Sequence, residues 1–148
     1  RVLGTRLVVF LDASAIIYLL EGDSAAQAAV RDTLSTLRAA ADREPPTLAV
    51  SALSRLECRV RPLRDGDQAL IDGYEAFFAD PGLTVIGLNT DVLDRAAELR
   101  ARCRLRTPDA LQAASLLVAD VDGAFVTGDA DFTSVPELRV HTVKSASN

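Results

Sequence analysis

Four acidic side chains stand where a folded chain seldom places them, at the ends of apolar strands or beside apolar helix faces. They are Asp12, Glu57, Asp109 and Asp129. Buried or half-buried carboxylates repel one another and are costly to desolvate, so a cluster of them persists only if protonation or a bound cation neutralises it. A hard cation such as Mg²⁺ or Mn²⁺ is the natural partner of an all-oxygen ligand set. The four carboxylates therefore indicate a metal site.

Each of these residues, taken alone, also has an ordinary structural explanation. Asp12 follows an apolar strand and could cap the helix after it. Asp109 falls in the first turn of a helix, where the helix dipole stabilises any carboxylate. Asp129 lies in a Gly-Asp-Ala-Asp segment that could be a simple turn. Only the order and spacing of the four together favour a shared chemical role.

Glu57 is the least easily explained of the four. At about 100° per residue it lies close to the helical stripe formed by Leu53, Leu56 and Val60, rather than on a solvent face. The alternative is an ion pair with Arg61, four residues later on the same helix. We expect one of these two environments for its carboxylate.

The elements that must position these residues alternate between strands and helices. Apolar and β-branched runs predict strands at 7–11, 47–50, 83–88 and 124–127, with a possible edge strand at 138–143. Predicted helices cover 15–20, 24–43, 52–61 after a Ser51 cap, 66–79, 90–102 after Asn89 or Thr90, and a last helix with Thr107 as cap and Pro108 in its first position. Pro62 should end the third of these helices.

This alternation predicts an α/β fold with a mostly parallel sheet and helices on both of its faces. In such sheets, ligands bind beyond the carboxyl ends of the strands. Asp12 and Asp129 both follow predicted strands and should meet at that edge.

Size and composition limit the possible classes of protein. A chain of 148 residues with 49% hydrophobic content can build one core, so we expect a single domain over 1–148. The longest apolar run, 7–11, is far shorter than the roughly 20 residues of a membrane helix. We therefore expect a cytoplasmic protein with no membrane partner. The net charge of −5 argues against broad adhesion to polyanions, but divalent cations at the acidic cluster would leave a nucleic acid possible as substrate.

Four segments together resemble the PIN-domain family and, more narrowly, the VapC-type toxins of bacterial toxin–antitoxin pairs. The segments are 11–14, 55–57, 105–114 and 126–132, and the resemblance spans about 7–143. Thr107-Pro108-Asp109-Ala110 is the most specific part of this pattern. The resemblance implies a PIN-like α/β/α sandwich.

The same resemblance assigns roles to individual residues. Asp12, Glu57, Asp109 and Asp129 match the family's acidic set, which holds Mg²⁺ or Mn²⁺ and performs catalysis. Ser14 and Thr127 match its hydroxyl positions, and Asp131 is a second acid in the last motif. The implied function is that of a metal-dependent endoribonuclease that acts on RNA, with a cognate antitoxin as partner and a homodimer as the assembly.

Other observations bear on mechanism and on rival functions. The one histidine, His141, lies outside every motif and excludes ribonuclease chemistry built on a His pair. Arg106 and Arg61 flank acidic motifs and could contact RNA phosphates, although arginines on exposed helices are common. A haloacid-dehalogenase-like phosphatase would need an Asp at Ser14. The remaining alternative is a PIN-type RNA-processing nuclease, or an inactive binding module, without an antitoxin.

Overall fold

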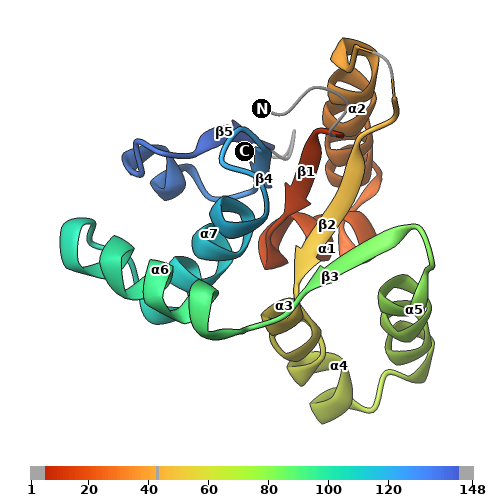
Figure 1. The fold of residues 1–148 in the computed structure, drawn as a ribbon. Coiled ribbons are helices and arrows are strands. Elements are labelled where there is room, and N and C mark those ends of the chain that lie inside the picture. Colours follow the sequence, from red (N-terminus) through yellow and green to blue (C-terminus); the bar gives the residue numbers. More distant parts are fainter. Residues whose placement is uncertain (1–5, 43, 144–148) are drawn as a thin grey trace.

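The strands form one sheet in which every neighbouring pair runs parallel. The structure is a computed structural model that describes residues 6–42 and 44–143. Its sheet has the order β3-β2-β1-β4-β5 (Figure 1), with strands β1 Val8–Leu11, β2 Thr47–Ser51, β3 Leu83–Ile86, β4 Ala124–Thr127 and β5 Arg139–Thr142. The predicted α/β class and the parallel sheet are confirmed, including the strand at the C-terminal edge.

The strand order reverses direction at β1. From β1 the chain adds β2 and β3 on one side, and then β4 and β5 on the other. Leu11 is therefore in register with Val50 of β2 and with Val126 of β4. Ligands of doubly wound sheets bind at such a reversal, beyond the carboxyl ends of the strands. The residues that directly follow β1 and β4 occupy this position.

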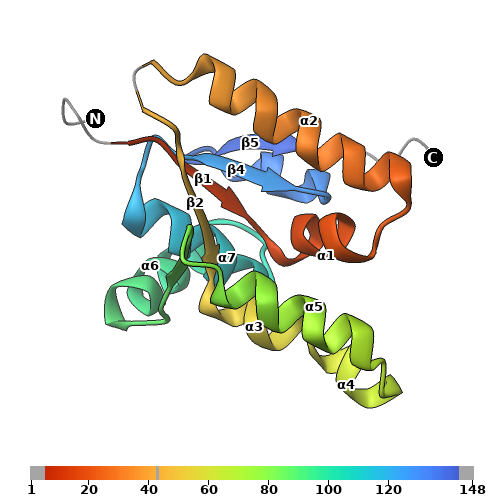
Figure 2. The same ribbon diagram turned by 90° about the vertical axis from the view of Figure 1, so that its right-hand side faces the viewer.

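Helices cover both faces of the sheet, as Figure 2 shows. Helices α1 and α2 lie on one face and α6 and α7 on the other, while α3 continues from the end of β2. The bounds are α1 Ala13–Glu21, α2 Ser24–Ala40, α3 Ala52–Glu57, α4 Val60–Asp65, α5 Gln68–Ala79, α6 Thr90–Arg102, α7 Thr107–Ala119 and a 3₁₀ turn at Ala130–Ser134. No helix in the described ranges is both long and apolar enough to cross a membrane.

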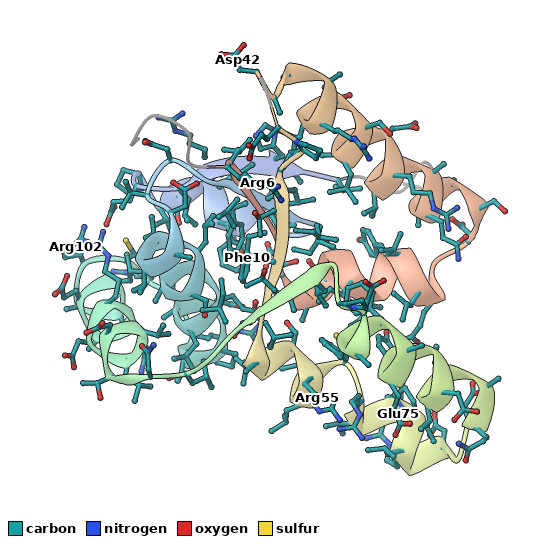
Figure 3. The ribbon with its side chains drawn as sticks, turned by 45° about the vertical axis from the view of Figure 1, so that its right-hand side comes forward. Arg6, Phe10, Asp42, Arg55, Glu75 and Arg102 are labelled. Atoms are coloured by element: carbon teal, nitrogen blue, oxygen red, sulfur yellow. The ribbon has the colours of Figure 1, made fainter. Side chains whose placement is uncertain are left out.

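Two hydrophobic clusters, one on each face, hold the sheet in place. Phe10 faces α6 and α7 and stacks on Phe125 with ring centroids 5.3 Å apart; Figure 3 shows Phe10 at the centre of the molecule. Leu11 and Val126 face α1 on the opposite side. Full burial of each such side chain is worth about 1.5–3 kcal/mol. The pleat of β1 therefore anchors both helical layers and fixes the position of the residue after Leu11.

The predicted helix at 52–61 is wrong, because the structure divides it into α3 and α4. Ser51 caps α3 as expected by accepting a hydrogen bond from the Leu53 amide. Pro62, however, lies in the first turn of α4 instead of ending a helix. The first N–H groups of a helix have no partner within it, so proline costs little there.

Other helix ends differ from the prediction by a few residues. Gly66 has φ +64°, a left-handed conformation that ends α4, so α5 begins only after the Asp67 cap. Helix α2 ends at Ala40, and residue 43 lies outside the described residues. Arg106, not Thr107, occupies the cap position of α7, because the Thr107 hydroxyl instead accepts a hydrogen bond from Arg100.

Gly123, between α7 and β4, allows a close approach that a larger residue would prevent. A Cβ atom there would lie 2.6 Å from Cδ1 of Leu116 and 3.0 Å from the carbonyl oxygen of Val8. We predict that Gly123→Ala lowers the free energy of unfolding by about 1–3 kcal/mol, because the contacts include backbone that cannot move freely. Urea denaturation measures this change.

Gly73→Ala is the matched control, since Gly73 lies within α5 and a Cβ atom would meet no atom within 4 Å. It should stabilise the protein by about 0.5–1 kcal/mol through helix propensity. Equal effects of the two substitutions would contradict the close packing at Gly123.

Candidate active site at the carboxyl end of the sheet

Asp12 directly follows the central strand and is only 4% exposed. Its Oδ1 accepts hydrogen bonds from the Ser14 hydroxyl at 2.7 Å and from the Ala15 amide at 2.9 Å. Its Oδ2 accepts one from the Thr127 hydroxyl at 2.5 Å. The bond from Ala15 caps α1, so the structural role considered for this residue is real. The second oxygen connects β1 to β4 across the strand reversal.

The protein environment disfavours the charged form of this carboxylate. Burial raises the pKa of Asp12 above its ordinary value, and the hydrogen bonds from Thr127, Ser14 and Ala15 only partly offset that effect. The neighbouring Asp129 carboxylate raises the pKa further. No arginine or lysine forms an ion pair with Asp12 within the described ranges. A bound cation would supply the compensating charge that these residues lack.

The loop after β4 joins this network through two hydroxyl groups. The Gly128 amide donates to Ser14 Oγ at 2.8 Å, and the Asp129 amide donates to Thr127 Oγ1 at 2.9 Å. Asp129 Oδ1 in turn accepts a hydrogen bond from the Asp131 amide at 2.8 Å. Asp129 is half-buried and acts electrostatically on Asp12, whereas Asp131 is exposed. Of the two acids in this loop, Asp129 is the one near the buried carboxylate.

Glu57 lies in neither of the two environments expected from the sequence, because its carboxylate is bound by Gln112. The stripe proposed beside it is not a core face, because Leu56 is 62% exposed. Arg61 does not bind it either, because that guanidinium pairs with Glu21. Instead, the Gln112 side-chain amide donates to Glu57 Oε1 at 2.9 Å and to the Ser54 hydroxyl at 3.0 Å. Glu57 therefore faces α7.

Helix α7 provides the third acidic position as well as the support for Glu57. Asp109 lies in the first turn of this helix and is half-buried. Gln112 follows it by three residues and so lies on the same side of the helix. The nearest cation to Asp109 is Arg106, whose Nε is 3.4 Å from Oδ2. A single helix therefore positions two of the four carboxylates.

Cys58 directly follows Glu57 and contacts the residue after Asp12. Its Sγ is 3.8 Å from the carbonyl oxygen of Ala13, directly after Asp12. Burial raises the pKa of the Cys58 thiol to about 12, and the charges of Glu57 and Asp12 contribute to the rise. This contact joins the end of α3, next to Glu57, to the start of α1, next to Asp12.

The residues present fit a hard cation by donor type. Asp12 is surrounded by the hydroxyl oxygens of Ser14 and Thr127, and the described part of the site contains no histidine, since His141 is exposed on β5. Within the described residues, no group of three or more acidic, histidine or cysteine side chains is close enough to hold a metal ion. Carboxylates that no cation neutralises repel one another, which favours a larger separation between them.

Sequence reasoning missed Gln112, the only polar residue among the buried side chains of α7 besides Ser115. Its Oε1 is buried and has no hydrogen-bond partner in the described part of the chain. The available signal was its spacing, because a polar residue three positions after Asp109 on an apolar helix needs a buried partner. That partner comes from α3, which the sequence alone does not reveal.

Asp12→Asn tests the electrostatic state of the site without metal. The raised pKa means that the ionised carboxylate destabilises the folded state at pH 7. This penalty declines as pH falls below the folded-state pKa and is gone below the lower pKa of the unfolded state. We therefore predict that the variant melts at the same or a higher temperature than the wild type at pH 7, in EDTA, with a smaller difference at acidic pH. Calorimetry over a pH series measures this effect. Asp32→Asn, on exposed α2, is the control, and a large loss of Tm specific to Asp12→Asn would contradict the account.

Several solved structures share this fold at low sequence identity. The VapBC2 complex of Rickettsia felis bound to a promoter DNA fragment has a TM-score of 0.73 at 15% identity, covering 93% of this chain and 100% of that chain. Mycobacterium tuberculosis VapC20, a toxin that cleaves the sarcin–ricin loop, has a TM-score of 0.68 at 16% identity, covering 89% and 98%. A toxin–antitoxin complex from Klebsiella pneumoniae has 0.65 at 21% identity, covering 90% and 96%. These likenesses support the α/β/α sandwich.

Sequence comparison assigns the family directly. No curated protein sequence matches the chain significantly. The model of the PIN domain matches residues 9–138, which include most of β1, all of α7, the loop after β4 and all four carboxylates. The chain belongs to the PIN-domain family.

Proposed function

We propose that this protein is a metal-dependent endoribonuclease and the toxin of a type II toxin–antitoxin pair. The observation that carries the proposal is the buried Asp12 carboxylate at the strand reversal, which has a raised pKa and no cationic partner in the described residues. Membership of the PIN-domain family and the likeness to toxin structures support the same conclusion. The alternative is an RNA-processing nuclease or an inactive binding module.

The proposed roles follow from the surroundings of each side chain. Asp12 and Asp109 would bind Mg²⁺ or Mn²⁺ directly, while Glu57 and Asp129 would bind it directly or through water. One or two such ions lower the pKa of water and neutralise charge on the phosphoryl oxygens. Ser14 and Thr127 hold the Asp12 oxygens in a fixed orientation. Asp131 supports the loop through its amide.

A groove between α1 and α5 supports the antitoxin part of the proposal. The cavity measures about 770 Å³ and has an apolar floor that includes Leu20, Leu70 and Phe77. Its other lining residues include the acids Asp67 and Asp80, together with Glu21, which is already paired with Arg61. An apolar groove with acidic margins suits an amphipathic segment that carries basic residues. We propose that the antitoxin binds here and extends a cationic side chain toward the carboxylates.

The homodimer remains a prediction. An exposed apolar stripe on α3 and α4 would favour it, since Leu56, Val60 and Leu63 are 62%, 49% and 51% exposed. Val60 and Leu63, three residues apart, share one side of α4, and Leu56 lies near the end of α3; exposed apolar side chains of this kind suit a protein contact.

Cleavage should depend on a divalent cation and on the acidic residues. We predict activity with Mg²⁺ or Mn²⁺, none in EDTA and little with Ca²⁺, whose longer and more flexible coordination misplaces the attacking water. Asp12→Asn and Asp109→Asn should each lower the rate by more than about 100-fold, since loss of even an indirect partner of a metal ligand costs 10- to 100-fold. Asp32→Asn should remain active. Gel assays with end analysis should find 5′-phosphate and 3′-hydroxyl products, whereas 2′,3′-cyclic phosphate would contradict hydrolysis by water.

Expression in a bacterial host tests the toxin assignment. The wild-type chain should arrest growth, and Asp12→Asn at equal soluble level should not. Co-expression with the neighbouring short gene should restore growth if that gene encodes the antitoxin. Equal growth of all strains, with cleavage intact in vitro, would favour the RNA-processing nuclease.

A further inference from the structure

Residues 100–106, which form the end of α6 and its connection to α7, concentrate positive charge beside Asp109. This segment carries an arginine at every second position, namely Arg100, Arg102, Arg104 and Arg106. Cys103 and Leu105, which alternate with them, pack against the cluster around Phe10, and Leu105 is 8% exposed. All four arginines are exposed, and Figure 3 shows Arg102 at the outer end of α6. Residues 100–106 line a cavity of about 530 Å³.

Arg100 fixes the shape of this segment. Its Nε donates to the Leu105 carbonyl oxygen at 3.0 Å, and its Nη1 donates to the Thr107 hydroxyl at 3.0 Å. These bonds tie the end of α6 to the start of α7 across the connection. The residues between them, including Arg104, are therefore held on an ordered backbone.

Ion pairs neutralise the segment only in part. Arg102 pairs with Glu137 at 2.5 Å, and this interaction raises the pKa of Arg102 and lowers that of Glu137. Arg106 is 3.4 Å from Asp109, but its side chain is 83% exposed, and exposed pairs of this kind contribute little. Neither Arg100 nor Arg104 forms an ion pair within the described ranges. Two of the four charges thus lack a carboxylate, in a chain whose net charge is −5.

The segment leads into the N-terminal end of α7, where the helix itself adds positive charge. Arg106 is the cap residue of α7, and no side chain caps that end of the helix. The N-terminal amides of α7 add partial positive charge at the same place. Asp109 lies within that first turn, so the arginine segment ends directly beside this carboxylate, at the N-terminal end of α7.

We propose that the 100–106 segment binds the RNA backbone, with Arg104 contacting a phosphate next to the scissile one. Arg100 acts as a positioning residue that holds the segment, and Arg102 is committed to Glu137. Arg61, the other arginine suggested by sequence, is committed to Glu21. The inference rests on the proposed ribonuclease function and specifies where its substrate lies.

Salt-dependent binding tests the proposal. The probe is a fluorescein-labelled single-stranded RNA of mixed sequence, titrated with the wild-type chain in Ca²⁺ over a NaCl series. Each phosphate contact in a single strand contributes about 0.7 to the slope of log affinity against log salt. Arg104→Gln should lower affinity several-fold and reduce that slope by about 0.7. Arg104→Lys should retain the slope, and Arg31→Gln, an exposed arginine on α2, should match the wild type.

The outcomes separate this inference from the function on which it rests. If the wild type neither binds nor cleaves RNA, the proposed function fails first. If it does both, and Arg104→Gln has the affinity and slope of Arg31→Gln, the phosphate site is overturned while the nuclease stands. Unchanged RNA binding together with weaker inhibition by the co-expressed partner would assign the segment to an acidic protein surface instead, and would also overturn the proposal.

Discussion

The burial of one carboxylate governs the arrangement of this site. Asp12 follows the central strand, whose alternate side chains anchor both hydrophobic clusters, so its position is fixed by the core itself. Three hydrogen bonds satisfy its oxygens, yet burial still raises its pKa. Binding a cation would relieve the cost of this desolvated and unpaired charge, so the buried carboxylate favours cation binding.

The residues proposed to act with Asp12 come from several different elements. The strand reversal places Thr127 and the loop with Asp129 beside Asp12, because β1 and β4 are neighbours in the sheet. Helix α7 adds Asp109 and, through Gln112, fixes Glu57 from α3. The positive segment before α7 then lies beside Asp109. The acidic side chain of Asp109 and the basic side chain of Arg106 thus lie together at the N-terminal end of α7.

The strands and most helices of the fold could be predicted from the sequence, whereas side-chain partners that are distant in the chain could not. Apolar runs identified β1 and β4, since a strand buried on both faces has a distinctive composition. Asp12 and Asp129 could be grouped because parallel strands end at one edge, whereas Glu57 and Asp109 joined them only through the resemblance to the PIN-domain family. The partner of Glu57 could not be found, because Gln112 reaches it from 55 positions away in the chain. Pro62 was misplaced because proline suits the first turn of a helix as well as it ends one. The four-residue spacing suggested an ion pair between Glu57 and Arg61, but Arg61 pairs with Glu21 of α1 instead.

Direct measurement of Mn²⁺ binding by electron paramagnetic resonance tests the central claim, because it needs no substrate and no knowledge of the RNA. We predict that the wild-type chain binds Mn²⁺ and that its affinity falls as pH is lowered through the raised pKa of Asp12. Asp12→Asn should lose most of the binding, while Asp32→Asn should keep it. Equal Mn²⁺ affinity in the wild type and Asp12→Asn would contradict the claim that this buried carboxylate is built to hold a cation.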